Sequence, residues 1–239
     1  MNKSWKFEAF ILGALLCAGL LSIGYLLGKS AIEFKEYERT VTVKGLAERE
    51  VAADIAIWPI KFIVASNETE ALYANLEAKT NAVNQFLAKQ GFSNIEITTN
   101  APTIEDRKAQ SYGNNGEIPF RYLATQVMTV YTEQVDAVRE SKKQLTQLGK
   151  AGVVVVGDDY SARTEYLFNG LNTLKPMMVE EATRQAREVA GKFAQDSNSQ
   201  LGKIKQARQG QFSIVDRDSN TPHIKKVRVV STVEYYLSD

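Results

Sequence analysis

An uncharged hydrophobic run near the N-terminus, Ala9 to Leu27, is the feature that most limits how this chain folds. The run is rich in Leu, Ile, Ala and Gly, and as a helix it is roughly 28 Å long at about 1.5 Å per residue. That length matches the hydrocarbon core of a bilayer, which a helix crosses with all its backbone polar groups paired. The sequence therefore predicts a membrane-spanning helix over residues 9–28, with the lipid bilayer as its partner.

A cleaved signal peptide is the alternative interpretation, because lysines precede the apolar run as in a signal n-region. Three features favour a retained anchor instead. The run is longer than a typical signal core of about 7 to 15 residues, and Lys29 follows it in place of an A-x-A segment. The best small-x-small site, Ser22-Ile23-Gly24, lies inside the run. We therefore expect an uncleaved anchor between a short tail, residues 1–8, and a charged connector, residues 29–39.

The orientation of this helix follows from the layout of the chain. Basic residues flank the run in similar numbers on both sides, so the positive-inside rule alone does not decide. A short tail followed by a large domain is typical of a signal anchor, since long domains cross the membrane largely regardless of their charge. We expect residues 1–8 in the cytoplasm and the domain outside it.

The composition excludes two broad classes of protein. Of 239 residues, 44% are hydrophobic, which is enough to bury a core and argues against a disordered chain. The 29 Lys and Arg residues nearly balance the 28 Asp and Glu residues, so no strong positive charge favours nucleic acid as a partner. The single cysteine, Cys17, lies inside the hydrophobic run, so the domain has no thiol for a disulfide, a zinc site or a nucleophile.

Alternating hydrophobic residues predict β-strands from Thr40 onward. A short pattern covers residues 40–43, and a longer run from Ile55 to Ala65 alternates strictly. Pro59 removes one backbone donor from this run, which favours an edge strand or a bulge at that point. The side chains expected on the buried face of the run are Ala56, Trp58, Ile60, Phe62 and Val64.

Three later stretches have helical periodicity. The first begins near Ser66 and ends at Gly91, with Leu72, Leu76, Val83 and Leu87 on its apolar face. The second runs from Glu133 to Leu148 and the third from Thr173 to Gln200. We expect the third helix to bury Val179, Ala182, Ala186, Val189, Ala190 and Phe193, and to pair Glu180 with Arg184 and Glu188 with Lys192 on its outer face.

The remaining segments predict two short strands, at 153–156 and 161–168, and two hairpins. The hairpins join residues 94–107 to 120–131 and residues 203–213 to 226–237, and their tips, Ser111–Gly116 and Asp216–Pro222, are polar.

These elements define the expected fold class. Residues 40–131 and 152–237 then share the order β-β-α-β-β, which suggests an internal duplication. We expect an α+β fold in which a mixed or antiparallel sheet is covered by helices. It forms one continuous body over residues 40–239.

The search for chemistry yields no catalytic, cofactor-binding or metal-binding residue. His223, the single histidine, follows a proline in a polar loop and is expected to be solvated. The pairs Glu105-Asp106 and Asp158-Asp159 are sequence neighbours, and on a strand such neighbours point to opposite faces. Asp216 and Asp218 lack the ligand spacing and the glycine of a calcium loop. Phosphate-loop, dinucleotide and G-x-S-x-G motifs are absent from the sequence.

Three segments resemble a known family. They are Val41-Thr-Val-Lys-Gly45 with Asp54-Ile55-Ala56, the Ala-rich stretch Glu181 to Ala194 leading into Leu201-Gly202-Lys203-Ile204, and the alternating strand Val227 to Leu237. Together they are similar to the SIMPL-domain family, bacterial envelope proteins that include oxidative-stress-defence and periplasmic immunogenic proteins. The chain departs from the family at Ala53, where many members have proline.

This resemblance implies a mixed α+β fold and homo-oligomers of ring-like or channel-like form, and it carries over no active-site residue. Our hypothesis is a non-enzymatic, self-assembling protein of the bacterial inner membrane with a periplasmic domain, in a setting of stress defence. The two hairpin tips are its expected contact surfaces. A periplasmic module that binds a small molecule or a peptide is the alternative, and an enzyme using carboxylates alone is a third hypothesis.

Overall fold

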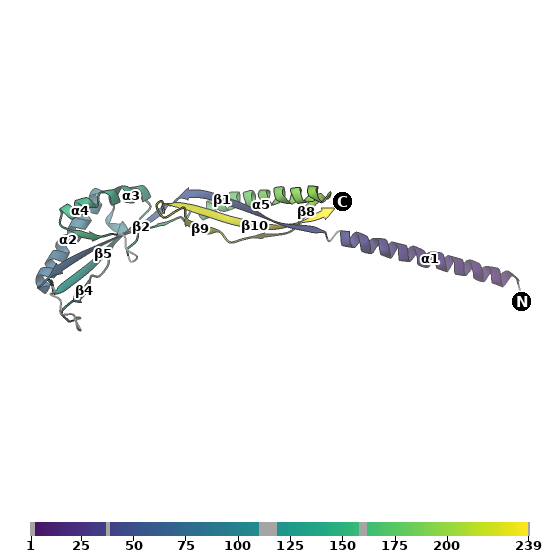
Figure 1. Ribbon diagram of the computed structural model, residues 1–239, viewed down its shortest axis with the longest axis horizontal. Helices are drawn as coiled ribbons and strands as arrows, with labels where there is room; N and C mark the ends of the chain where they lie inside the picture. The colour runs from purple at the N-terminus through teal and green to yellow at the C-terminus, as the bar shows by residue number, and fades with distance from the viewer. Residues whose placement is uncertain (1–2, 37–38, 110–118, 158–161, 239) are drawn as a thin grey trace. The chain divides into compact units, whose positions relative to one another are not determined.

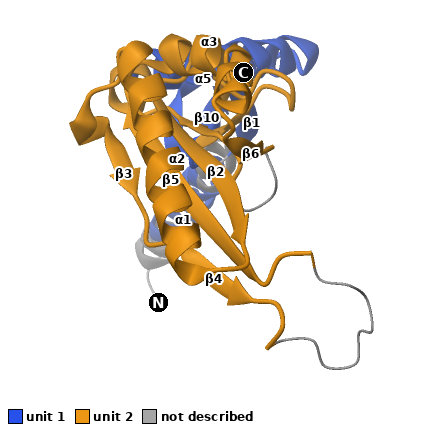
Figure 2. Cartoon of the chain, turned by 90° about the vertical axis from the view of Figure 1, so that its left-hand side faces the viewer, with its two compact units in different colours: residues 1–48, 175–212, 228–239 blue, residues 49–174, 213–227 orange. Residues whose placement is uncertain are grey.

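The computed structural model describes residues 3–36, 39–109, 119–157 and 162–238 (Figure 1). The chain divides into two compact units, each built from segments distant in sequence (Figure 2). Unit 1 comprises residues 1–48, 175–212 and 228–239, and unit 2 comprises residues 49–174 and 213–227. We expected one continuous body after Thr40, whereas both units take elements from both halves of the chain.

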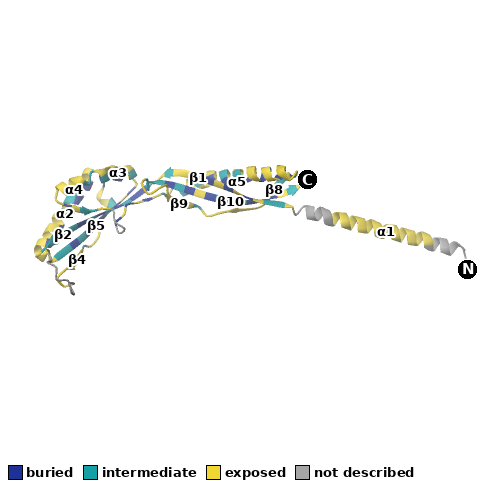
Figure 3. Ribbon diagram, in the orientation of Figure 1, coloured by how far each residue is buried: buried dark blue, intermediate teal, exposed yellow. Residues whose placement is uncertain are grey.

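The first helix, α1 (Lys3–Glu36), contains the expected membrane span. Its segment Phe10–Ser30 is apolar and long enough to cross a bilayer, and none of it is buried against the rest of the protein (Figure 3). The helix continues through most of the charged connector and ends at Glu36. The connector therefore extends the helix in this structure.

Three strands of a four-stranded sheet and one helix form the body of unit 1. Strand β10 (Ile224–Ser238) lies between β1 (Thr40–Ala52) and β8 (Gln200–Gln209), and β10 and β8 are antiparallel. Helix α5 (Leu171–Asp196) packs on this sheet through a stripe of mostly small side chains, Met178, Ala182, Ala186, Ala190 and Ala194. The core of the unit is completed by Val43, Val233 and Tyr235.

The contact between β1 and α5 is unusually close at Gly45. A Cβ placed on this residue would lie 1.8 Å from the carbonyl oxygen of Ala182 and 2.6 Å from the backbone nitrogen of Ala186. Only a residue without a side chain fits there. The facing residues of α5, Ala182 and Ala186, are fully buried.

This close contact explains why two large side chains of α5 are not buried as the periodicity predicts. Val189 and Phe193 were expected on the buried face of α5, but they are 37% and 55% exposed. We call the close contact between α5 and β1 at Gly45 the seam. The side chains of Val189 and Phe193 are too large for the seam, so alanines face β1 and the two larger residues lie outside it. The ion pair on the outer face joins Arg184 to Glu188 at 3.0 Å, in place of the two expected pairs.

The buried hydroxyl of Tyr235 leads to a stability prediction. The residue is 1% exposed, and its hydroxyl has no hydrogen-bond partner within the described part of the chain. Burial raises the pKa of this phenol. Because an unpaired buried hydroxyl costs free energy, Tyr235→Phe should leave the free energy of unfolding unchanged or raise it by about 1 kcal/mol. Denaturant unfolding checks this, and a loss of stability would reveal a partner for the hydroxyl.

Unit 2 has a larger antiparallel sheet at its centre. Its strands follow the order β3 (Ile97–Thr99), β5 (Tyr122–Thr132), β2 (Ile55–Ser66) and β6 (Val154–Val156), while β4 (Thr103–Asp106) pairs with β5 and β7 (Glu165–Leu167) with β2. Helix α2 (Thr69–Lys89) covers the sheet with its predicted apolar face, and Gly91, at φ +92°, follows the helix. The alternating face predicted for β2 is fully buried in the core. Strand β9 (Ser213–Asp216) pairs with β10.

Pro59 does not place β2 at an edge of the sheet, as the sequence suggested. One side of β2 pairs with β5 without a bulge, and Pro59 lies opposite Thr129. The other side pairs with β7 over Ile55–Ile57 and with β6 over Lys61–Ile63. The proline falls in the gap between these two short strands, where a missing backbone donor costs no hydrogen bond.

The second predicted helix is broken in two. Two residues separate helix α3 (Val135–Lys143) from helix α4 (Thr146–Lys150). Between them the backbone bonds shorten to a three-residue spacing, with Leu145 N donating to Lys142 O and Leu148 N to Leu145 O. Neither glycine nor proline marks this break, so the helical pattern in the sequence concealed it.

The expected duplication is present as an order of elements. Each half has two strands, a long helix and three strands, because β3 and β4 both lie along β5 as β8 and β9 both lie along β10. The halves exchange strands, however: β1 pairs with β10, while β6 and β7 pair with β2. A short 3₁₀ helix, η1 (Asn94–Glu96), precedes β3.

Candidate functional site

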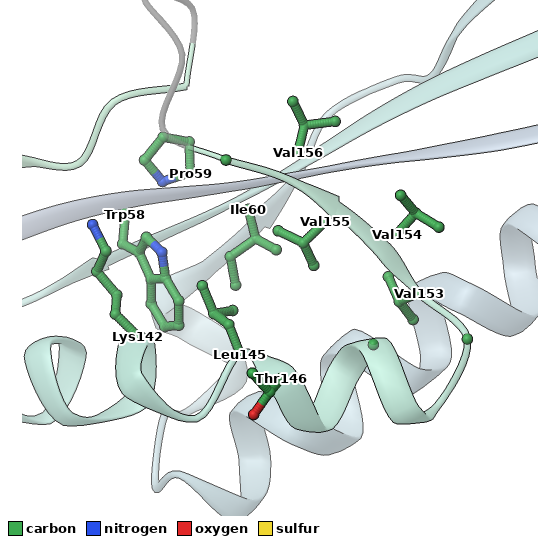
Figure 4. A pocket seen from close by; sticks show the side chains of 13 residues that line it. Trp58, Pro59, Ile60, Lys142, Leu145, Thr146, Val153, Val154, Val155 and Val156 are labelled. Atoms are coloured by element: carbon green, nitrogen blue, oxygen red, sulfur yellow. The ribbon is translucent and has the colours of Figure 1, made fainter.

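An apolar pocket of about 590 Å³ lies in unit 2 between β2, β6 and the α3–α4 junction. Figure 4 shows Trp58, Ile60, Leu145 and Val155 pointing toward one another inside it. Lys142 and Thr146 supply polar groups at the same pocket. A pocket of this volume and polarity suits a small molecule with an apolar part.

Local backbone features explain why this pocket exists. The gap beside Pro59 leaves β2 without a strand neighbour between β6 and β7. Gly152, at φ +74°, then turns the chain sharply from α4 into β6, and Val153 N donates to Leu148 O at 2.9 Å. The short helix α4 and strand β6 therefore form one wall, and the segment of β2 around Pro59, which has no strand neighbour on this side, forms the other.

A second pocket, of about 450 Å³, is lined by basic side chains of unit 2. Arg139, Lys142 and Lys143 come from α3, and Arg163 from the segment before β7. Lys142 Nζ donates to Thr164 Oγ1 at 2.7 Å, and Lys142 also lines the apolar pocket. We call this second pocket, with these four basic residues, the cationic pocket.

The far wall of the cationic pocket is the β9–β10 turn, which includes the predicted hairpin tip Asp216–Pro222. Asp218 holds this turn by accepting hydrogen bonds from the backbone nitrogens of Asn220 and Thr221, at 2.8 Å each. Hydrogen bonds from Thr221 and Arg217 hold the pKa of Asp218 well below its ordinary range. Arg217 also pairs with Glu50 at 3.3 Å. This tip is therefore tied to the body of unit 2.

Asp216 and Asp218 do not form a cation site in this structure. The Asp216 carboxylate instead forms an ion pair with the buried Lys225. Both carboxylates thus serve the turn itself.

His223 lies at the end of this turn and is partly buried, not solvated as the sequence suggested. Its carbonyl oxygen accepts a hydrogen bond from Ala53 N at 2.8 Å, and its ring packs edge-on against Tyr166 at 6.0 Å between centroids. Burial lowers the pKa of His223, Arg139 lowers it further, and Asp136 partly opposes them. The imidazole therefore lies at the wall of the cationic pocket in a site that disfavours a further positive charge.

Of the other acidic pairs from the sequence, the structure describes Glu105-Asp106. Asp106 binds Arg121 at 2.9 Å, and the hydrogen bond from this arginine lowers the pKa of Asp106. Asp158-Asp159 and the tip Ser111–Gly116 lie outside the described residues. Within the described ranges, no three His, Cys, Asp or Glu side chains come together as a metal-ligand group.

Comparison with known proteins identifies the family. The model of a family of unknown function, SIMPL (DUF541), matches residues 41–234. The chain belongs to the SIMPL family. No curated protein matches the chain. A SIMPL domain that follows one apolar helix fits a membrane-anchored envelope protein.

The segments that carry the SIMPL resemblance have structural roles in this chain. Gly45 and the alanines of α5 form the close seam of unit 1. Asp54 lies at the turn between β1 and β2, where its carboxylate accepts hydrogen bonds from the backbone nitrogens of Asn169 and Gly170, just before α5. These positions explain the fold and contribute nothing to either pocket of unit 2.

The cationic pocket is not apparent from the sequence. Its only local signal was the group Arg139, Lys142 and Lys143, which has the spacing of one helix face. The near-zero net charge of the whole chain conceals this local excess of positive charge. The rest of the pocket wall comes from Arg163 and the β9–β10 turn, which are distant in the sequence.

Proposed function

We propose that this SIMPL protein is a non-enzymatic protein of the bacterial inner membrane that self-assembles through unit 1. In this proposal α1 anchors the chain with residues 1–8 in the cytoplasm and both units in the periplasm. The observation that carries the proposal is the exposure of Val189 and Phe193 on α5. Defence against oxidative or envelope stress is the setting that we propose from the family resemblance.

The outer surface of α5 is the proposed contact with a second copy of the chain. Val189 and Phe193 are one helical turn apart, so they form a continuous apolar patch. In an amphipathic helix that packs through alanines, two large apolar side chains on the water-facing side favour a protein contact.

Helix contacts are a better candidate for assembly than the open edge of the sheet. Strand β8 has β10 as its one strand partner among the described residues, so its other edge is unpaired. Lys203, Lys205 and Arg208 lie along this strand and are exposed. Charged edge strands resist pairing with further strands. We therefore place the proposed contact on α5.

Replacing Phe193 by Glu tests this contact. The substitution places a charge in the proposed interface, so we expect the assembly to dissociate toward monomers, with at least a tenfold weaker association. Light scattering of the full-length protein in mild detergent measures the mass. Tyr73→Glu is the matched control, because Tyr73 is also a 55% exposed aromatic residue on a helix, but it lies in unit 2. Equal masses for the two variants would remove α5 from the proposal.

Small-molecule binding is a second candidate function, favoured by the apolar pocket beside Pro59. The pocket holds about 590 Å³ and is lined mainly by valines, Trp58 and Leu145. Thr146→Trp, at the exposed rim, should fill it and abolish any thermal shift produced by apolar envelope metabolites. A shift of equal size in the wild type and the variant would argue against this pocket.

A further inference from the structure

The lining of the cationic pocket carries a strong excess of positive charge. Arg139, Lys142, Lys143 and Arg163 contribute four cationic side chains, and among the described residues no acidic side chain lines the pocket. The four come from two separate segments of unit 2, so the fold itself brings them together. A concentration of like charge is unfavourable unless a counter-ion binds, so the pocket has a reason to hold an anion.

Two of these cations, Arg139 and Lys143, have exposed carboxylate partners on their own helix, α3. Arg139 binds Asp136 at 2.7 Å, and the Asp136 side chain is 87% exposed. Lys143 binds Glu140 at 2.7 Å, and both of these side chains are more than 60% exposed. Such exposed pairs are weak in water. Arg139 and Lys143 are therefore available to a ligand that offers a stronger partner from within the pocket.

Neutral donors complete the arrangement around the cations. The β9–β10 turn places Ser219 and Asn220 at the pocket, and β7 and its preceding segment supply Thr164 and Tyr166. Phosphate has several oxygens and carries up to two charges, so it accepts from several cations and neutral donors at once. A monovalent carboxylate would use fewer of these groups.

We propose that the cationic pocket binds a phosphate-bearing ligand, held by Arg139, Lys142 and Arg163 with Lys143 at its rim. The proposal is independent of self-assembly through unit 1, because both walls of this pocket belong to unit 2. Soluble phosphorylated metabolites and the headgroups of anionic phospholipids offer the same chemistry.

His223 makes this proposal measurable, since it is the single histidine of the chain and lies at the pocket wall. The charged groups that act on its ring are Arg139, Arg217, Asp136 and Asp218. A bound phosphate stabilises the imidazolium form, so it raises the pKa of His223 from its lowered position. A ligand that binds elsewhere leaves this pKa unchanged.

The experiment titrates untagged full-length protein in nanodiscs of zwitterionic lipid with pyrophosphate. We expect saturable binding by calorimetry and an upward shift of the His223 pKa by NMR of the imidazole C–H groups. Arg163→Gln and Arg139→Gln should each weaken binding about tenfold, since a hydrogen bond between charged groups is lost. Arg163 is exposed, so its replacement leaves the fold intact, which circular dichroism checks.

The matched control is Arg184→Gln, which removes an arginine of unit 1 that is paired with Glu188. Equal weakening of binding by Arg184→Gln would overturn the proposal, and so would a His223 pKa that stays constant during binding. Saturable binding to neither pyrophosphate nor phosphatidylglycerol would also overturn it. Nanodiscs of phosphatidylglycerol without pyrophosphate distinguish the sources. A His223 shift there identifies a lipid headgroup, and a shift with pyrophosphate alone identifies a soluble ligand.

Discussion

Replacing Gly45 by Ala is expected to destabilise unit 1 by about 3 kcal/mol or more. The added Cβ would lie 1.8 Å from the Ala182 carbonyl oxygen and 2.6 Å from the Ala186 nitrogen, far inside van der Waals contact. Both atoms belong to the backbone of α5, so no side-chain rotation relieves the overlap. The helix must move away from β1, and the buried alanine seam opens to water.

The control for this prediction is the same substitution at Gly191, in α5 itself. No atom lies within 4 Å of a Cβ built there, and alanine favours helices over glycine by roughly 0.5 to 1 kcal/mol. Gly191→Ala should therefore leave stability unchanged or raise it. Denaturant unfolding of the full-length protein in detergent, with hydrogen exchange of the α5 amides, compares the two. Identical unfolding midpoints would show that β1 and α5 do not pack as closely as described.

Introducing two arginines into α1, Leu16→Arg with Leu20→Arg, should remove the protein from the membrane. Each arginine near the centre of a spanning helix opposes insertion by about 2.5 to 3.5 kcal/mol, and the two lie one turn apart. We expect the wild type to remain in the membrane fraction after alkaline extraction and the double variant to become soluble or to be degraded.

The pair Leu16→Ile with Leu20→Ile is the matched control, because it keeps the segment apolar and should stay in the membrane. The intact mass of the wild type separates an anchor from a cleaved signal, since the uncleaved chain is 26.6 kDa. A shorter wild-type chain, or a double-arginine variant that stays in the membrane fraction, would contradict the anchor.

Local sequence patterns predict burial correctly where a residue's surroundings are decided by the helix or strand that contains it. The alternation of β2 and the heptad-like face of α2 both predicted buried residues that the structure confirms. Gly91 marked the end of α2 because only a positive φ continues the chain there. These features decide the α+β class, which was predicted before any tertiary contact was known.

Contacts between distant segments account for the remaining errors. Val189 and Phe193 have the right period for a buried face. However, Gly45, far away in the sequence, lets β1 approach the backbone of α5 so closely that the facing side chains are alanines. Pro59 suggested an edge strand because the sequence does not show that two short strands pair on either side of it. The sequence predicts a solvated His223 because nothing near it in the sequence indicates the contact with Tyr166.

The mass of the wild-type full-length protein, extracted from membranes in mild detergent, tests the central proposal most directly. Native mass spectrometry across a range of protein concentrations should give one defined multiple of the 26.6 kDa chain. That result would support a membrane-anchored protein that self-assembles. A monomer at every concentration would contradict it.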